Sequence, residues 1–247
     1  AHEFLYGSDE PFHDPFLMKD MAKSVERIWQ AIERKERITV YGDYDVDGIS
    51  ASSLLYLFLK DCGADVNTYI PERKSEGYGL NIEALNTLHA DGTTLVVTVD
   101  CGISAVKEIA GAPAGLDIIV TDHHTPPEVL PEAYALVNPH QKDCGYPFEH
   151  LSGVGVAFKL CQALYKYRHA DEPLWSGNTE FVALGTVADI VPLWGENRAL
   201  VKMGLKQMET TANIGLKALM EKSRCPQKDI TSENIGFILA PRLNAVG

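Results

Sequence analysis

Short apolar runs rich in β-branched residues alternate with stretches of helical character between residues 38 and 140. The apolar runs cover residues 38–41, 66–70, 95–99, 118–120 and 135–137, and the helical stretches cover 49–61, 81–90 and 104–110. Near-continuous apolar runs suit strands that are buried on both faces, and their alternation with helices predicts βαβ units. We therefore predict an α/β fold in which a parallel β-sheet is flanked by helices.

The segments on either side of this region are mainly helical in pattern. Residues 14–37 predict an amphipathic helix with Asp14 and Pro15 as its cap and first turn. Further helices are predicted at 153–168, 178–188, 196–210 and 213–222. We expect residues 1–150 to form the α/β core and residues 151–247 to complete it as a helical segment. Residues 241–247 are typical of a loop interior, so we expect the chain to be a fragment.

Composition narrows the class of protein. With 45% apolar and 23% charged residues, no run of about 18 uninterrupted apolar residues and no basic-then-apolar leader, the chain is expected to be cytoplasmic and to have no membrane contact. Five cysteines without a CxxC pair argue against a disulfide framework or a thiolate zinc site. The net charge of −12 excludes a broadly basic surface. An acidic surplus is consistent with carboxylates that bind divalent cations. Such cations make the local electrostatic potential positive, so that a phosphate can bind.

Acidic and imidazole side chains follow three of the predicted strands. They are Asp43, Asp45 and Asp47 after the first strand, Asp100 after the third, and Asp122, His123 and His124 after the fourth. The carboxyl ends of parallel strands line one crevice, so the fold would bring these groups together. Carboxylates with imidazole suit Mn²⁺ or Mg²⁺. The sequence therefore predicts a divalent metal centre.

The acidic and imidazole residues at the strand ends also fit other patterns. An aspartate after a strand is often a helix N-cap, but Asp43, Asp45 and Asp47 would repel one another without a counter-charge. An EF-hand loop fails because its twelfth position is Leu54. A haloacid-dehalogenase-type phosphatase, with Asp45 as nucleophile and Asp47 as acid/base, stays an alternative, although no later paired-acid loop follows. Neighbouring side chains at a strand end point in opposite directions, so only one histidine can easily face a metal.

These residues resemble the motifs of the DHH phosphoesterases, and the remainder is similar to the RecJ-type single-strand exonuclease branch of that family. The matching motifs are the segment from His13 to Phe16, YGDYDVDG at 41–48, IPERKSEGYGL at 70–80, VDCG at 99–102, DHH at 122–124, VNPH at 137–140, LSGVGVAFKL at 151–160, LGTVADIVPL at 184–193 and APRLNAVG at 240–247. The resemblance extends over essentially the whole chain.

The resemblance implies a two-metal centre. Asp45 and Asp47 would ligate separate ions, Asp43 would be an additional or outer ligand, and Asp100 would bridge the pair. His123 would join Asp47 and Asp189 on one ion.

The remaining site residues are also assigned by the resemblance. Asp122 and His124 would lie behind the metal ligands or touch the phosphate, and we count both as catalytic together with Asp43 and Asp100. Arg73, Arg242 and Asn244 would contact phosphate. Ser152, with Gly153 and Gly155, could present backbone N–H groups to an anion, although close helix packing explains the glycines equally well.

The implied activity is metal-dependent hydrolysis of phosphodiesters by a 5′-to-3′ single-stranded-DNA exonuclease of DNA repair and recombination, with two divalent ions, Mn²⁺ or Mg²⁺. Single-stranded DNA is the expected partner, a helicase and a single-strand-binding protein are further candidates, and the chain is expected to be a monomer. Full-length relatives carry a further DHH-associated domain and an OB-fold. The alternatives are an oligonucleotide or cyclic-dinucleotide phosphodiesterase, a pyrophosphatase, and a non-catalytic replication scaffold.

Overall fold

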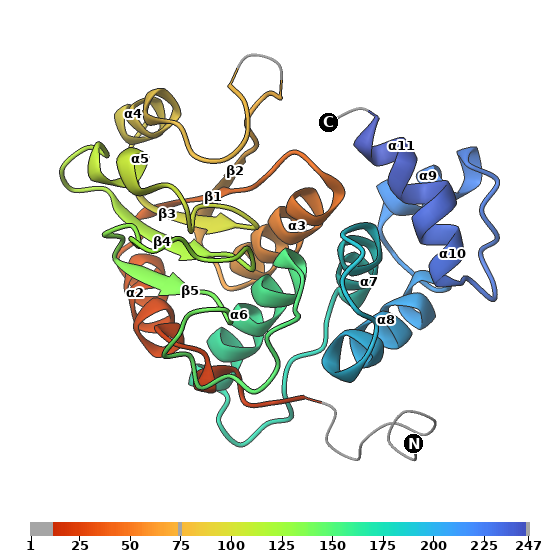
Figure 1. Cartoon of the computed structure of the whole chain (residues 1–247). Helices are drawn as coiled ribbons and strands as arrows, with labels where there is room; N and C mark the ends of the chain where they lie inside the picture. Colours follow the sequence, from red (N-terminus) through yellow and green to blue (C-terminus); the bar gives the residue numbers. More distant parts are fainter. Residues whose placement is uncertain (1–11, 74–75, 246–247) are drawn as a thin grey trace.

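The structure, a computed structural model, describes residues 12–73 and 76–245 and contains a single parallel sheet within them (Figure 1). Its strands are β1 (Arg37–Tyr41), β2 (Asp65–Tyr69), β3 (Thr93–Val99), β4 (Asp117–Thr121) and β5 (Ala135–Val137). They are arranged in the order β2-β1-β3-β4-β5, and every neighbouring pair is parallel. The predicted α/β fold is confirmed, and each strand begins and ends within two residues of its predicted range.

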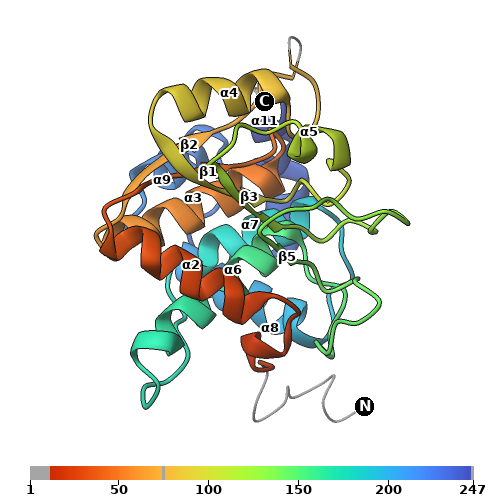
Figure 2. The same cartoon turned by 90° about the vertical axis from the view of Figure 1, so that its left-hand side faces the viewer.

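Helices cover both faces of the sheet (Figures 1 and 2). One face packs against α2 (Met21–Glu33), α3 (Val46–Asp61) and α6 (Gly153–Arg168), and the other against α4 (Ile82–Ala90) and α5 (Val106–Ala110). Alternate strand residues supply the two cores, as the pleat requires: Val97 points to the first and Val96 to the second. The first core also contains Phe158 of α6, so residues on both sides of position 150 share it.

The N-terminal helix is interrupted, which corrects the prediction of one helix over residues 14–37. A short 3₁₀ turn, η1 (Pro15–Leu17), comes first, with the Asp14 carboxylate accepting from the Phe16 N–H as a cap. Asp20 then adopts a left-handed conformation with φ of 59°, and α2 begins at Met21. Left-handed backbone cannot continue a right-handed helix, which explains the break.

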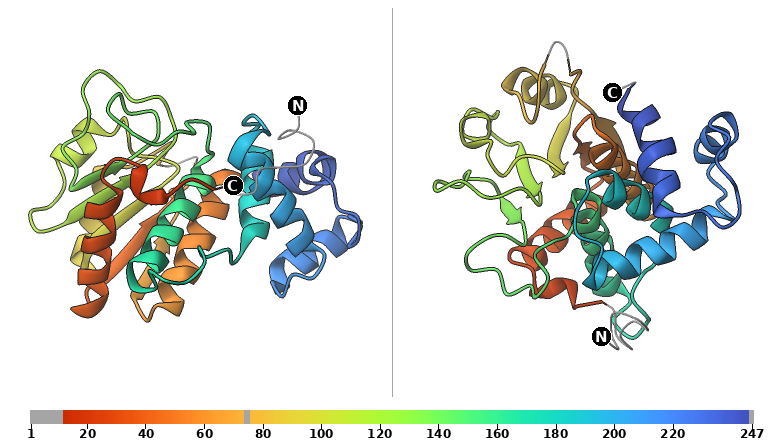
Figure 3. Two further views of the ribbon diagram at one scale, coloured as in Figure 1. Left: turned by 90° about the horizontal axis from the view of Figure 1, so that it is seen from below. Right: turned by 45° about the vertical axis from the view of Figure 1, so that its right-hand side comes forward.

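The C-terminal helices form a separate layer beside α3 and α6 (Figure 3). They are α7 (Thr179–Ala188), α8 (Gly195–Met208), α9 (Ile214–Lys222), α10 (Ser232–Asn234), a π-helical turn η2 (Ile235–Leu239) and α11 (Ala240–Asn244). The prediction of a loop from residue 241 is wrong as far as Asn244, and residues 246–247 lie outside the described residues. Pro241 does not prevent the helix because it occupies the first turn, where its missing N–H is not needed.

The strand order places a switch point between β1 and β3. The chain leaves β1 towards β2 on one side and then continues from β3 towards β4 and β5 on the other. Ligands of open α/β sheets bind outside the carboxyl ends of the strands at such a point. Within the described part of the chain, no helix combines the length and apolar character needed to cross a membrane.

Candidate metal centre

The loop after β1 directs its aspartates to different places. The Asp45 carboxylate caps α3 by accepting from the Gly48 N–H at 2.9 Å. Asp47, in the first turn of α3, is buried and reaches the start of α6, where it accepts from the Gly153 N–H at 2.6 Å and the Val154 N–H at 3.0 Å. The positive end of the α6 dipole therefore stabilises the Asp47 carboxylate.

Asp100 follows β3 and is held in an unusual conformation. Its φ of 61° lies in the left-handed region, which is uncommon for residues other than glycine and is frequent at functional sites. A Cβ on Gly153 would lie 2.4 Å from Asp100 Oδ1, and a Cβ on Gly185 would lie 2.5 Å from Asp47 Oδ1. Both glycines are needed because buried carboxylates pack directly against the backbone of α6 and α7.

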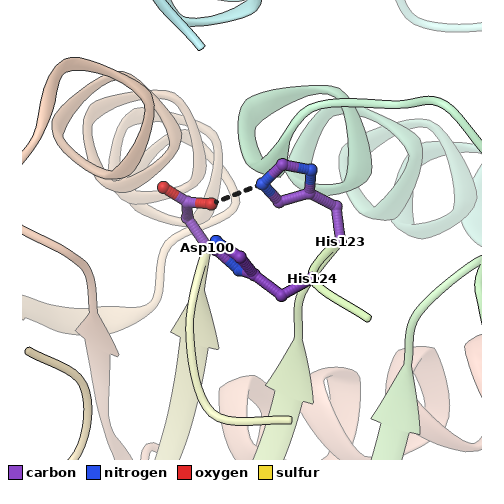
Figure 4. Close-up of side chains that lie close together, drawn as sticks. All are labelled: Asp100, His123 and His124. Atoms are coloured by element: carbon purple, nitrogen blue, oxygen red, sulfur yellow. Dashed lines mark ion pairs between the residues drawn. The ribbon is translucent and has the colours of Figure 1, made fainter. Parts of the chain in front are cut away.

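His123 meets three of these carboxylates. Its Nε2 lies 3.1 Å from Asp100 Oδ1, 3.7 Å from Asp189 Oδ2 and 4.0 Å from Asp47 Oδ2. Figure 4 shows the closest of these pairs, with His123 and His124 carried by the loop after β4. Residues that are far apart in the sequence therefore converge at the carboxyl edge of the sheet.

The potential ligand atoms form adjacent sets. Those of Asp47, His123 and Asp189 all lie within 4.8 Å of one another, and those of Asp43, Asp45 and Asp100 do so as well. Asp100 also lies within this distance of His123 and His124, so it connects the sets. Their composition, carboxylate with a single imidazole or none, suits Mn²⁺ or Mg²⁺.

Unpartnered buried atoms indicate that the sets are built for cations. Asp43 Oδ1, Asp100 Oδ1 and His123 Nε2 are inaccessible to solvent and make no hydrogen bond among the described residues, although Asp100 Oδ1 and His123 Nε2 face each other at 3.1 Å. Leaving such an atom unpaired costs about 1–3 kcal/mol. Divalent cations would bind these atoms directly, so the residues present fit a metal centre.

The carboxylates of the centre resist ionisation in the absence of a cation. Burial raises the pKa of Asp43 to about 6 and that of Asp47 to about 7. Burial, reinforced by the neighbouring charges of Asp47 and Asp45, raises the pKa of Asp100 well above its ordinary value. Burial also raises the pKa of Asp189. Positive charge among these groups would reverse each of these shifts.

Asp122 has a different environment from the other acids. Its Oδ1 accepts from the backbone N–H groups of His123 and His124 and lies 2.7 Å from the His124 Nδ1, while its Oδ2 accepts from the Ile103 N–H. Burial opposes ionisation of Asp122, but the bonds from His124 and Ile103 outweigh it and hold the pKa below its ordinary value. Asp122 thus fixes the loop and the His124 ring and does not join either ligand set.

Two of the predicted phosphate contacts lie beside the centre. Arg73 and Asn244 line a pocket of about 350 Å³ together with Asp43, Tyr44, Asp45 and Tyr78. The Arg73 guanidinium lies 5.2 Å from the centre of the Tyr44 ring. Asn244 Oδ1 accepts from the Val46 N–H at 3.1 Å, which fastens α11 to the start of α3.

The other two predicted contacts are differently placed. Arg242 is exposed on α11, donates to the Ile238 carbonyl at 2.5 Å and is not among the residues lining this pocket. Ser152 is buried and caps α6: its Oγ accepts from the Gly155 N–H and lies 2.9 Å from the Thr186 Oγ1. This arrangement corrects the expectation for Ser152, because its hydroxyl and the first α6 N–H groups already have partners within the protein.

The residues Tyr44, Tyr78 and Gly185 belong to the site but were not singled out from the sequence. Tyr44 lies between Asp43 and Asp45 in the sequence, and this position is the one sequence feature that could have indicated its place in the site. Gly185 has no signal of its own, since a glycine within a helix is usually a matter of packing. Asp189 ends α7 and would pass for an ordinary helix terminus without the family resemblance.

The sheet is doubly wound, and buried carboxylates and imidazole lie at its switch point. This combination places the chain among the α/β proteins that bind cations at the carboxyl ends of their strands. The chain belongs to the DHH family: the model described as "DHH family, N-terminal domain" matches residues 37–186. The resemblance seen in the motifs is thereby confirmed.

Individual relatives agree with this assignment. The chain is 46% identical to the single-stranded-DNA-specific exonuclease RecJ of Bacillus subtilis over 248 residues, which cover all of this chain and 31% of the relative. The RecJ of Thermus thermophilus in complex with Mn²⁺ superposes with a TM-score of 0.82 at 33% identity, over 100% of this chain and 35% of that one. The structure of the same RecJ with Mg²⁺ superposes with a TM-score of 0.67 at 31% identity, over 93% of this chain and 29% of that one. The chain thus spans about a third of the length of these relatives.

Proposed function

We propose that the chain is the catalytic part of a single-stranded-DNA exonuclease that hydrolyses phosphodiesters with two divalent cations. The observation that carries the proposal is the pair of adjacent ligand sets at the switch point, with three buried ligand atoms that lack hydrogen-bond partners among the described residues. The printed names of the relatives supply the substrate, single-stranded DNA, and their structures supply the metals, Mn²⁺ or Mg²⁺.

The protein groups divide the binding of the cations. Asp47, His123 and Asp189 would hold one ion, Asp45 and Asp43 would hold the other, and Asp100 would bridge them. Cations in these positions would supply an activated water and neutralise charge on the phosphate. The left-handed backbone at Asp100 and the close approach of Gly153 keep the bridging carboxylate in a single position. We also propose that residues 1–150 form the α/β core and that residues 151–247 form a helical segment that leads to a further domain.

Other side chains would act on the substrate itself. Arg73 lines the pocket beside Asp43 and Asp45, where its planar guanidinium can donate two hydrogen bonds to a phosphate. The hydrogen bond to Asp122 raises the pKa of His124 and occupies Nδ1, and Nε2, whose contact with the Tyr78 hydroxyl is long at 3.5 Å, would donate to a phosphate oxygen. The 5′-to-3′ polarity and a place in DNA repair and recombination follow from the family resemblance alone.

The test uses single strands labelled at either the 5′ or the 3′ end, with Mn²⁺ or with EDTA, and an Asp100→Ala variant. We expect the 5′ label to be released first, in Mn²⁺ only, and not by the variant. Calorimetric titration with Mn²⁺ should give two sites in the wild type. Early release of the 3′ label, or hydrolysis that survives EDTA and the substitution, would refute the proposal. Preference for a dinucleotide over a longer strand would favour the oligonucleotide phosphodiesterase instead.

A further inference from the structure

A second pocket lies at the carboxyl edge of the sheet, on the side of the metal centre opposite Arg73. Arg73 follows β2 at one end of the strand order, whereas the loop that forms this pocket follows β5 at the other end. The pocket has a volume of about 370 Å³, and its walls include His140, Lys142, Phe148, Glu149, His150 and Trp194. Apart from Asp189 at the end of α7, the candidate metal ligands follow β1, β3 and β4, the three strands between β2 and β5.

Hydrogen bonds attach the walls of this pocket to the metal centre. Asn138 Nδ2 donates to the His124 carbonyl at 2.9 Å, and Asn138 Oδ1 accepts from the His140 N–H at 2.8 Å. The buried Asn197 Nδ2 donates to the carbonyls of His150 and Pro192 at 2.6 and 3.0 Å. One wall is therefore fixed to the DHH loop and the other to the segment that follows Asp189.

The segment that leads from Asp189 to this wall contains a strained residue, which is not itself among those lining the pocket. Ile190 has a φ of 61° although its side chain is β-branched, and it is 88% exposed. A left-handed conformation is a genuine outlier for such a residue, and strain of this kind gathers at functional sites. No burial of the side chain offsets this strain, and the hydrogen bond from Asn197 to the Pro192 carbonyl holds the segment in place.

The chemistry of the pocket suits a flat aromatic ligand. Trp194 is 49% exposed, and its ring centre lies 5.2 Å from those of both Phe148 and His150. The Glu149 carboxylate lies 3.9 Å from His140 Nδ1 and 3.9 Å from His150 Nε2, and burial lowers the pKa of His140. The pocket walls carry the opposite charges of Lys142 and Glu149, and a nucleobase can stack on the exposed Trp194 ring and donate its amino group to Glu149.

We propose that this pocket binds one nucleobase of a single-stranded DNA substrate, on the side of the scissile phosphate away from Arg73. Trp194 provides the stacking surface, His150 lies beside it with its ring inclined at 59°, and Asn138 and Asn197 fix the position of the pocket relative to the metal centre. The inference rests on the proposed function and adds to it a path for the strand across the sheet edge. Stacking would place successive phosphates over the cations without reading the sequence.

The test is a coupling experiment between Trp194 and single bases. Pentanucleotides, each with one abasic site at a successive position, are hydrolysed in Mn²⁺ by the wild type and by Trp194→Ala. Trp194→Ala should raise KM for the intact strand about tenfold with little change in kcat, because stacking on one aromatic ring is worth about that factor. At one position, an abasic site should raise KM of the wild type by the same factor. At that position the abasic site should not raise KM of Trp194→Ala any further, because the stacking contact is already absent.

Matched variants separate stacking from folding. Trp194→Tyr should restore most of the affinity because it keeps an aromatic face. Tyr167→Ala removes an aromatic side chain that is equally exposed, 49%, but lies at the end of α6 remote from the metal centre, and should leave KM unchanged. A direct readout is tryptophan emission: DNA should change it in the wild type but not in Trp194→Tyr, which retains Trp29 and Trp175.

The inference would be overturned if the affinity loss from Trp194→Ala and the loss from an abasic site were additive at every position. It would also be overturned if Trp194→Ala lowered the melting temperature but left KM unchanged. Failure of the proposed function is recognised separately, by absence of Mn²⁺-dependent hydrolysis in the wild type or by hydrolysis that survives Asp100→Ala. In that case the emission titration decides alone: a DNA-dependent change confined to Trp194 supports the base pocket, and no change overturns it.

Discussion

Two groups of buried charges in this domain differ in whether the protein itself satisfies them. Lys159 and Glu196 are almost completely buried and form an ion pair at 3.1 Å. Lys159 also donates to the His13 carbonyl, and Glu196 accepts from the His13 N–H and the Tyr146 hydroxyl. At the carboxyl edge of the sheet, by contrast, carboxylates face one another with unpartnered oxygens.

The difference shows what each group contributes. A paired and hydrogen-bonded buried charge fixes the relative positions of α6, α8 and the N-terminal segment. Uncompensated carboxylates oppose folding and are retained only where a function requires them. The first group therefore belongs to the stability of the protein, and the second to its chemistry.

The largest effect should come from breaking the satisfied group. Glu196→Ala leaves the buried Lys159 without its counter-charge and should lower the free energy of unfolding by about 3–5 kcal/mol, measured by urea unfolding. Replacing both residues by methionine should recover most of this loss. Lys19→Ala, which removes an exposed ion pair with Asp143, should cost less than about 1 kcal/mol. Equal losses for Glu196 and Lys19 would contradict the contrast between the regions.

A change beside the unsatisfied group should weaken metal binding in addition to the cost of repacking Val154, whose Cγ1 would lie 2.7 Å from a Cβ on Gly185. Gly185→Ala places a methyl group against Asp47 Oδ1 and should weaken Mn²⁺ binding about 10–100-fold, measured by calorimetry. Gly236→Ala is the control, since its Cβ would be 3.7 Å from Val187, an ordinary contact. Unchanged Mn²⁺ affinity in Gly185→Ala would mean that Asp47 is not a ligand.

Removing an unsatisfied charge should stabilise the metal-free protein. Asp100→Asn eliminates a buried carboxylate from a group of like charges, and asparagine tolerates the left-handed backbone. We expect the free energy of unfolding in EDTA to rise by about 1 kcal/mol, while Mn²⁺ no longer raises the melting temperature. A destabilised variant in EDTA would show that the carboxylate has a structural role.

The smallest effect is spread over several pH units. The folded-state pKa values of Asp43, about 6, and Asp47, about 7, lie above the ordinary value of 3.8 because both groups are buried. Between pH 4 and 7 the metal-free folded state therefore holds more protons than the unfolded state, and its stability should fall as the pH rises. Saturating Mn²⁺ should reverse this trend. Thermal melts at successive pH values check both slopes, and a flat profile in EDTA would contradict the account.

The sequence predicted the sheet and much of the centre because both depend on local patterns. Each buried strand is a short apolar run, and the acids at the ends of β1, β3 and β4 converge by topology alone. Asp189 lies on α7, whose approach to the sheet is a matter of tertiary packing, so only the family resemblance pointed to it. Packing also decides what the N–H groups after Ser152 bind, because a helix N-terminus has the same sequence signature whether it meets a phosphate or, as here, the buried Asp47.

Packing between distant segments also hid other features. The turns around Pro241 have the residue types of a loop because their helical state depends on a further apolar core among the C-terminal helices, where Ile235 and Leu239 pack against residues of α7, α8 and α9. The close contacts of Gly153 and Gly185 with carboxylates could not be read from glycine positions alone.

The central claim is that the carboxyl edge of the sheet holds two cations. Anomalous diffraction from crystals soaked in Mn²⁺ tests it most directly. We predict two peaks, one among Asp47, His123 and Asp189 and one among Asp43, Asp45 and Asp100. Peaks only at other positions, or a chain that binds Mn²⁺ without involving these side chains, would contradict it.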